Sequence, residues 1–188
     1  ISSLFIYILM MMQQIETRGN VENTTGLYGS LYELIIRDVI KGAAADYADL
    51  EVKLNYLSEF AFALYSRGKR FLEEAEFATW HARYCQEYNC QLDPLQMALQ
   101  FEAIGVFRKY EANIGFKYRY YYCFFLARYF ANNIHDNDIV EEIRKACLAL
   151  YDQDAANTML FLCHLSKDPR ILQMILRAVD GHFKDTTE

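Results

Sequence analysis

The sequence lacks the short motifs by which common enzymes are recognised. A phosphate-binding loop ending at Gly68-Lys69 would need a glycine at position 63, which is Ala63. Arg70 also stands where that loop requires Ser or Thr. The patterns G-x-S-x-G, H-E-x-x-H and C-x-x-C are missing as well. The chain therefore contains no catalytic motif, and we expect it to hydrolyse no ATP on its own.

An excess of basic charge and a long hydrophobic run are also missing. The formal net charge is −6, which argues against binding to a nucleic-acid backbone, and we predict no nucleic-acid partner. The apolar run at residues 1–12 is shorter than the roughly 20 residues that a membrane span needs, so we predict no membrane partner. This run has no basic segment before it and is not a signal peptide. We expect the chain to begin within a longer protein.

Cysteine is sparse and odd in number, which argues against a disulfide framework. The five cysteines lie mostly inside apolar helical patterns, as reduced core thiols do in the cytoplasm, and we predict a cytoplasmic protein. His81 and Cys85 are one helical turn apart, with Cys90 nearby, but a structural zinc site has four ligands in recognisable pairs. We therefore interpret them as core residues and predict no metal site. The adjacent Cys163 and His164 point to different sides of a helix and make no dyad.

What the sequence has in quantity is hydrophobic and aromatic residues, at 53% and 15%, arranged with helical spacing. Caps and apolar stripes predict a mainly α fold. The expected helices start near Ser2, Thr24, Tyr47, Glu73, Asp93, Tyr120, Ile139, Ala155 and Arg170.

One stretch departs from the helical pattern and predicts a β-hairpin. Val106, Phe107 and Tyr110 alternate before a turn at residues 111–113, and β-propensity resumes at residues 114–120. The second strand is expected to continue directly into a buried helix from Tyr120. We predict a helical subdomain at 1–43, a winged-helix-like unit with this small hairpin at 44–134, and a helical extension at 135–188.

The residues of the hairpin and its helix resemble a known family. IGFKYRYYYCFFLARYF is similar to the segment of NACHT and other STAND-type signalling ATPases in which an F-x-H-like triplet leads into a helix reading roughly E-F-x-A-A-x-Y. The triplet here is Phe116-Lys117-Tyr118. Upstream, LFIYILMMMQQIE and LYGSLYELIIRDVI resemble the helical subdomain after the nucleotide-binding core. The resemblance covers roughly residues 1 to 135.

The resemblance implies that the chain is the regulatory helical and winged-helix arm of such an ATPase. ATP or ADP would be bound mainly by a neighbouring nucleotide-binding domain of the same protein, with no cofactor held by this segment alone. Nucleotide exchange would release the arm and lead to homo-oligomerisation and effector signalling, in antiviral or innate immune defence.

The resemblance also implies the candidate site residues. The family places a nucleotide-contacting histidine where Tyr118 stands, and a tyrosine hydroxyl can donate a hydrogen bond but has no switchable charge near neutral pH. Lys117 and Arg119 are the neighbouring cations that could contact phosphate instead. Alternation along the predicted strand places both on the face opposite Phe116 and Tyr118.

Two alternatives belong to other classes. Short connections after Asn133 and abundant tyrosine also fit a helical-repeat interaction scaffold without a nucleotide role. A winged-helix DNA reader would need a basic recognition helix, and residues 93–105 contain no Lys or Arg. The aromatic run at residues 118–125 could stack on bases, but the acidic balance favours its interpretation as a strand entering a buried helix.

Overall fold

The computed structural model describes residues 24–166, 168–171, 173–175 and 177. The helix predicted at residues 2–17 and most of the helix predicted after Pro169 lie outside the described residues. The described chain is mainly helical, with one small antiparallel sheet, which confirms the predicted fold class. No helix in this part of the chain is long and apolar enough to cross a membrane.

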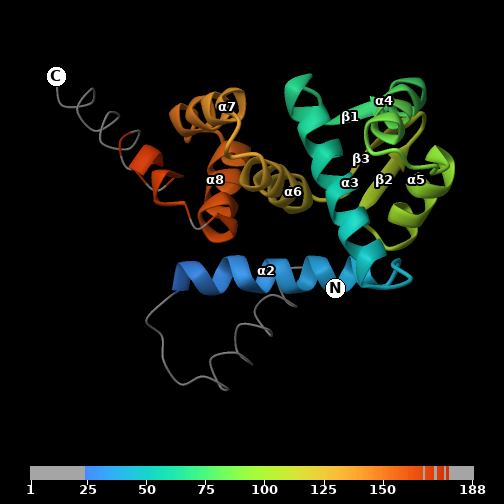
Figure 1. The fold of residues 1–188 in the computed structure, drawn as a ribbon, viewed down its shortest axis with the longest axis horizontal. Coiled ribbons are helices and arrows are strands. Elements are labelled where there is room, and N and C mark those ends of the chain that lie inside the picture. Colours follow the sequence, from blue (N-terminus) through green and yellow to red (C-terminus); the bar gives the residue numbers. More distant parts are fainter. Residues whose placement is uncertain (1–23, 167, 172, 176, 178–188) are drawn as a thin grey trace, which may run out of the picture.

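Helices account for most of the described chain, and they are arranged around α6 (Figure 1). α2 runs along one side, α3 rises from its end, α4 and α5 lie with the sheet, and α7 and α8 lie on the opposite side of α6. Their bounds are α2 Thr24–Lys41, α3 Tyr47–Ser66, α4 Glu74–Glu87, α5 Pro94–Ala103, α6 Arg119–Asn132, α7 Asn137–Leu148 and α8 Gln153–Leu165.

Aspartate side chains begin four of these helices, as the sequence predicts for three of them. Asp93 accepts a hydrogen bond from the backbone of Gln96 at the start of α5, with Pro94 at the first helical position. Asp46, Asp136 and Asp152 do the same for α3, α7 and α8. These caps fix where the helices start, and so which faces they turn to the core.

The sheet contains the predicted hairpin and a third, shorter strand. β2 (Phe107–Tyr110) and β3 (Asn113–Phe116) pair antiparallel around a turn at Glu111, whose φ is +53°. β1 (Phe71–Glu73) pairs antiparallel with the other side of β3, so the strand order is β1-β3-β2. This third strand comes from the short connection between α3 and α4.

Gly115 allows β1 to lie this close to β3. A Cβ atom at position 115 would come within 2.6 Å of the Arg70 carbonyl oxygen and 3.3 Å of the Phe71 Cβ. A lone glycine inside a strand pattern is typical of such a close backbone approach. The glycine therefore determines how Arg70, at the start of β1, is held.

The core is continuous across the sheet side and the α7–α8 side, with α6 at its centre. Phe124, Phe125 and Phe130 of α6 are at most 1% exposed, as the predicted helical stripe requires. Rings from α3 and α6 pack face to face, with 4.1 Å between the centroids of Phe62 and Tyr129. The helical spacing of α2 predicts that Leu31, Leu34 and Ile40 face the core, and Leu31 and Ile40 are buried as predicted. The prediction is wrong for Leu34, which is 56% exposed, whereas Ile36 is fully buried.

A cluster of charged residues ties α2, α3 and α6 together. Glu51 of α3 accepts hydrogen bonds from Arg37 of α2 at 2.5 Å and from Arg128 of α6 at 2.8 Å. We call these three residues the Glu51 cluster. The Arg128 side chain is only 17% exposed, and its Nε is buried without a hydrogen-bond partner in the described structure.

Candidate functional site

The three candidate residues line one large cavity, which lies between the end of β3, α6 and the α7–α8 side. Its volume is about 700 Å³, within the range of small-molecule sites. Lys117, Tyr118 and Arg119 are all exposed at this cavity. We call it the basic cavity. Its charged lining residues are Lys69, Arg70, Lys117, Arg119, Lys145, Asp152 and Asp154.

The positions of the three candidates correct the expected alternation. β3 ends at Phe116, Tyr118 is the residue before α6 and Arg119 is the first residue of the helix. Because the strand does not continue, Lys117 and Arg119 do not share a face opposite Tyr118. All three line the same cavity, and Tyr118 is 43% exposed instead of facing the core.

Arg119 contacts the far side of the cavity. Its Nε donates to an Asp154 carboxylate oxygen on α8 at 2.5 Å, and this hydrogen bond raises the pKa of the guanidinium. A terminal nitrogen of Arg70 lies 3.7 Å from the other oxygen of the same carboxylate. We call Arg70, Arg119 and Asp154 the Asp154 cluster. It joins the start of β1, the start of α6 and the start of α8.

The loop that brings Arg70 to the cavity depends on Gly68. This residue has a φ of +60°, and the backbone N–H groups of Gly68 and Lys69 donate to the carbonyls of Tyr65 and Leu64. These two bonds form the Schellman motif that ends α3. The chain then reverses and enters β1, which places Lys69 and Arg70 at the rim of the cavity.

The lining carries more positive than negative charge, although the whole chain is acidic. Five cations and two carboxylates line the cavity, giving a local charge of +3 against −6 for the chain. Two of the lysines pair with carboxylates outside the lining, Lys69 with Glu76 at 2.5 Å and Lys145 with Glu142 at 2.6 Å. The cavity is therefore electrostatically suited to an anion.

The walls behind the charged rim are aromatic and aliphatic. They are formed by Phe116 at the end of β3, by Tyr122, Leu126 and Phe130 of α6, and by Ala146 of α7. Burial raises the pKa of the Tyr122 hydroxyl, so it stays neutral. Such a cavity, mostly apolar with a few charged groups, is the usual form of a site for an organic ligand.

The cavity has no arrangement for nucleophilic catalysis. Among the described residues that line it there is no Ser, Cys or His, and their only hydroxyls are those of Thr158 and three tyrosines. The Thr158 hydroxyl donates to the Asp154 carbonyl oxygen at 2.7 Å. Nearby Cys123 is buried, and this burial together with Asp154 raises the pKa of its thiol to about 12. The site can bind, and its residues offer no activated nucleophile.

Of the three residues interpreted as core residues, His81 is buried, while Cys85 and Cys90 are partly buried against the core. His81 is 3% exposed, and its Nε2 lies 2.8 Å from the Leu92 carbonyl oxygen, which can only accept. Nε2 is therefore protonated, and Nδ1 accepts from the Tyr56 hydroxyl at 2.7 Å. In the described part of the chain, no group of three or more His, Cys, Asp or Glu residues is placed to hold a metal ion.

The other cysteine–histidine candidate, Cys163 and His164, does not form a pair. Cys163 is exposed on α8, while His164 turns towards α2. The His164 Nε2 lies 3.2 Å from a carboxylate oxygen of Glu33. This contact fastens the end of α8 to α2, and the two adjacent side chains do not meet at a common site.

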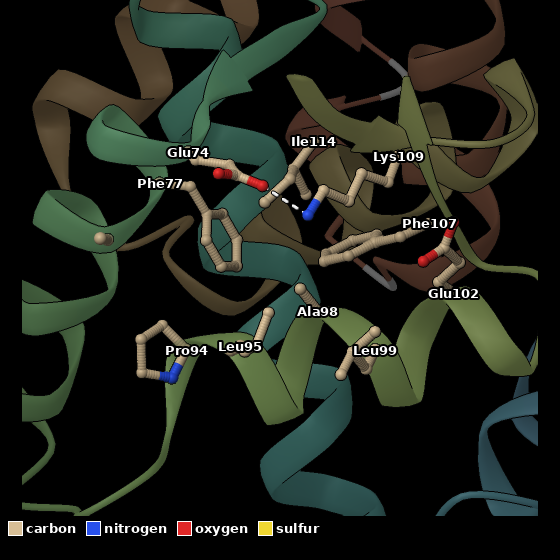
Figure 2. Close-up of a pocket in the computed structure, with 11 residues that line it drawn as sticks. Glu74, Phe77, Pro94, Leu95, Ala98, Leu99, Glu102, Phe107, Lys109 and Ile114 are labelled. Carbon is tan, nitrogen blue, oxygen red and sulfur yellow. Dashed lines mark ion pairs between the residues drawn. The ribbon is translucent and has the colours of Figure 1, made fainter. Parts of the chain in front are cut away.

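A second concave site, which we call the apolar groove, lies beside α4 and α5. Figure 2 shows it between α4, α5 and strands β2 and β3, with the ion pair of Glu74 and Lys109 crossing near Ile114. Its volume is about 190 Å³. Leu95 and Leu99 of α5 line it and are 56% and 45% exposed.

Sequence reasoning finds part of the basic cavity. It singles out Lys117, Tyr118 and Arg119, but interprets Lys69-Arg70 as a solvated link and Asp154 as one of two possible caps of α8. Arg119 and Asp154 are 35 residues apart, and no spacing rule connects them. The acidic N-terminal turn of α8 was visible only as a helix cap.

One comparison with known proteins finds a match. Residues 70–126 match the model of the family described as Novel STAND NTPase 4. The match begins at Arg70, spans the sheet with α4 and α5, and ends within α6. It confirms the resemblance to a STAND-type ATPase over this segment, which is less than a third of the chain. No curated protein and no solved structure matches the chain.

Proposed function

We propose that this chain is a regulatory arm of a STAND-type ATPase, in which a neighbouring domain outside the chain binds ATP or ADP. The observation that carries this proposal is the family match at residues 70–126, which falls on one compact unit of structure. That unit contains the sheet, α4, α5 and the start of α6. The arm would couple the nucleotide state to oligomerisation and to effector signalling, in antiviral or innate immune defence.

The topology of the unit supports a winged helix within the arm. Elements follow one another as α3, β1, α4, α5, β2 and β3, and the sheet has the order β1-β3-β2. Three helices with a three-stranded sheet whose last two strands form a hairpin make up a winged helix. In this proposal the hairpin is the wing, and the residues that follow it face the nucleotide.

The residues proposed to contact the nucleotide are Lys117, Tyr118 and Arg119. Lys117 has no carboxylate partner among the described residues, and its Nζ lies 5.4 Å from the centre of the Tyr118 ring. An unpaired cation beside an exposed tyrosine can contact a phosphate oxygen without first giving up an ion pair. Tyr118 adds a hydroxyl that can donate a hydrogen bond to a phosphate oxygen.

The test is the variant Lys117→Ala in the full-length protein. We expect loss of the cation to speed ADP release several-fold or to produce assembly without a trigger, measured with a fluorescent ADP analogue and by light scattering. Lys109→Ala is the matched control, because Lys109 is a lysine of the adjacent strand β2 at the apolar groove. Unchanged ADP release and unchanged assembly of Lys117→Ala would contradict a nucleotide-facing role.

The rival function, a helical-repeat scaffold, has less support. In a repeat array each unit contacts only its neighbours in the sequence. Here α8 packs on α6 and also returns to α2, where His164 reaches Glu33 across 131 residues of sequence. A closed arrangement of this kind favours a compact regulatory arm. A reading frame without a phosphate-binding loop in the few hundred residues before Ile1 would restore the rival.

A further inference from the structure

The Asp154 cluster leaves positive charge uncompensated at the rim of the basic cavity. Asp152 is engaged as the cap of α8, where it accepts from the backbone N–H groups of Asp154 and Ala155. Lys69 and Lys145 form ion pairs with Glu76 and Glu142, which do not line the cavity. Three cations of the lining, Arg70, Lys117 and Arg119, thus remain with the single carboxylate of Asp154.

The contacts within this cluster are also exchangeable. The side chains of Arg119 and Arg70 are 47% and 74% exposed, so their ion pairs with Asp154 are only weakly protected from water. Arg119 donates to Asp154 from Nε, and its two terminal nitrogens make no hydrogen bond to any other described residue. A guanidinium can donate two parallel hydrogen bonds to a phosphate group, whereas Arg119 donates a single hydrogen bond to Asp154.

We propose that the basic cavity binds an organic diphosphate, and that one of its phosphate groups replaces the Asp154 carboxylate between Arg70 and Arg119. Asp154 is then an internal anion that occupies the phosphate position when no ligand is bound. Lys117 contacts the second phosphate, so three cations face a ligand that carries about three negative charges. The organic group lies against Tyr122 and the apolar wall formed by Leu126 and Phe130.

This proposal deepens the proposed function but makes a separate claim. The proposed function requires a nucleotide held by another domain, whereas the diphosphate site is formed by this chain's own residues. It predicts binding to the 188-residue chain by itself. The residues that distinguish the two claims are Arg70 and Asp154, which the proposed nucleotide contact does not use.

The experiment measures binding of inorganic pyrophosphate to the 188-residue chain by isothermal titration calorimetry at low salt. We expect Asp154→Asn to bind about tenfold more tightly than the unmodified chain, because the competing carboxylate is gone. We expect Arg70→Gln to bind about tenfold more weakly. Arg70 is largely exposed, so this variant keeps the fold even if Asp154→Asn does not.

The matched control is Glu51→Gln, which removes the other carboxylate that two arginines share. Glu51 lines neither the basic cavity nor the apolar groove, and this variant should bind pyrophosphate as the unmodified chain does. Further titrations with ADP and with geranyl diphosphate identify the organic group. If ADP binds more tightly than pyrophosphate, the organic group of the ligand is aromatic. If geranyl diphosphate binds more tightly than pyrophosphate, the organic group is aliphatic.

Two results would overturn the proposal. One is the absence of pyrophosphate binding to both the unmodified chain and Asp154→Asn, with the fold verified by circular dichroism. The other is binding that neither Asp154→Asn nor Arg70→Gln alters. Binding by Asp154→Asn alone supports the competition. If the chain does not bind pyrophosphate while Lys117→Ala still changes ADP release in the full-length protein, the proposed function stands without the diphosphate site.

Discussion

The Glu51 cluster and the Asp154 cluster have the same composition, one carboxylate between two arginines, but different surroundings. In the Glu51 cluster both arginines lie within 2.8 Å of the carboxylate, and one of them is only 17% exposed. In the Asp154 cluster one contact is 3.7 Å long, and the two arginines are 47% and 74% exposed.

This difference indicates two uses of one arrangement. A half-buried carboxylate with two short contacts joins α2, α3 and α6, because separating the pair would leave a charge in a poorly hydrated place. In the Asp154 cluster the two arginines are exposed at a cavity, although Asp154 itself is only 21% exposed, and they can exchange the carboxylate for another anion because water solvates guanidinium groups that leave it. Burial of the arginines, more than the residue types, determines whether such a cluster is structural or can bind a ligand.

The largest expected effect comes from Gly115→Ala, which would separate β1 from β3 and displace Arg70. The added Cβ would lie 2.6 Å from the Arg70 carbonyl oxygen, so the backbone of β1 must move. We expect the free energy of unfolding to fall by about 3 kcal/mol, the upper part of the range for overpacking. Urea denaturation measures it.

The control for this variant is Gly42→Ala, after the end of α2. A Cβ there would meet only the Val39 carbonyl oxygen, at 3.3 Å, and a shift of a few tenths of an ångström relieves that contact. An equal loss of stability in both variants would mean that the close approach of β1 has no special role.

The next effect compares an arginine from each cluster. Arg128→Ala should lower the free energy of unfolding by about 2 kcal/mol, because it breaks a half-buried ion pair and removes a packed side chain from α6. Arg119→Ala should lower it by less than about 1 kcal/mol, as for exposed pairs. Thermal and urea unfolding of both variants measure the difference. Equal losses would contradict the division into a structural and an exchangeable cluster.

The sequence predicts those parts of the fold that local chemistry determines. Asp93-Pro94 correctly marks the start of α5, and Gly68 the end of α3, because caps and left-handed residues act over a few positions. The hairpin is correct for the same reason. Its second strand was predicted four residues too long, because residues 117–120 have high β-propensity while the buried contacts of α6 favour a helix.

The rest of the candidate site depends on tertiary contacts that no local pattern contains. Arg70 reaches the cavity only because Gly115 lets β1 join the sheet, and Asp154 only because α8 packs against α6. Neither residue differs in its sequence context from an ordinary solvated charge. Leu34 is a similar case. Its spacing fits the apolar face predicted for α2, but the elements that pack on α2 bury Ile36 and leave Leu34 exposed.

The pH dependence of stability that Glu51 contributes is a smaller effect than that of Arg128→Ala. Burial opposes ionisation of Glu51, but the hydrogen bond and attraction from Arg37, together with Arg128, outweigh it and lower the pKa of the carboxyl. Because the unfolded chain then binds the proton more readily, this stabilisation is present above about pH 4.5 and is lost as the pH falls through the folded-state pKa.

Glu51→Gln should cost about 1 kcal/mol at pH 7, and the difference from the unmodified chain should shrink between pH 5 and 3. Urea titrations over that range measure it, with Glu141→Gln, in an exposed pair with Arg144, as the reference for losing one negative charge. A difference that stays constant with pH would show that Glu51 acts in this cluster through packing and not through its charge.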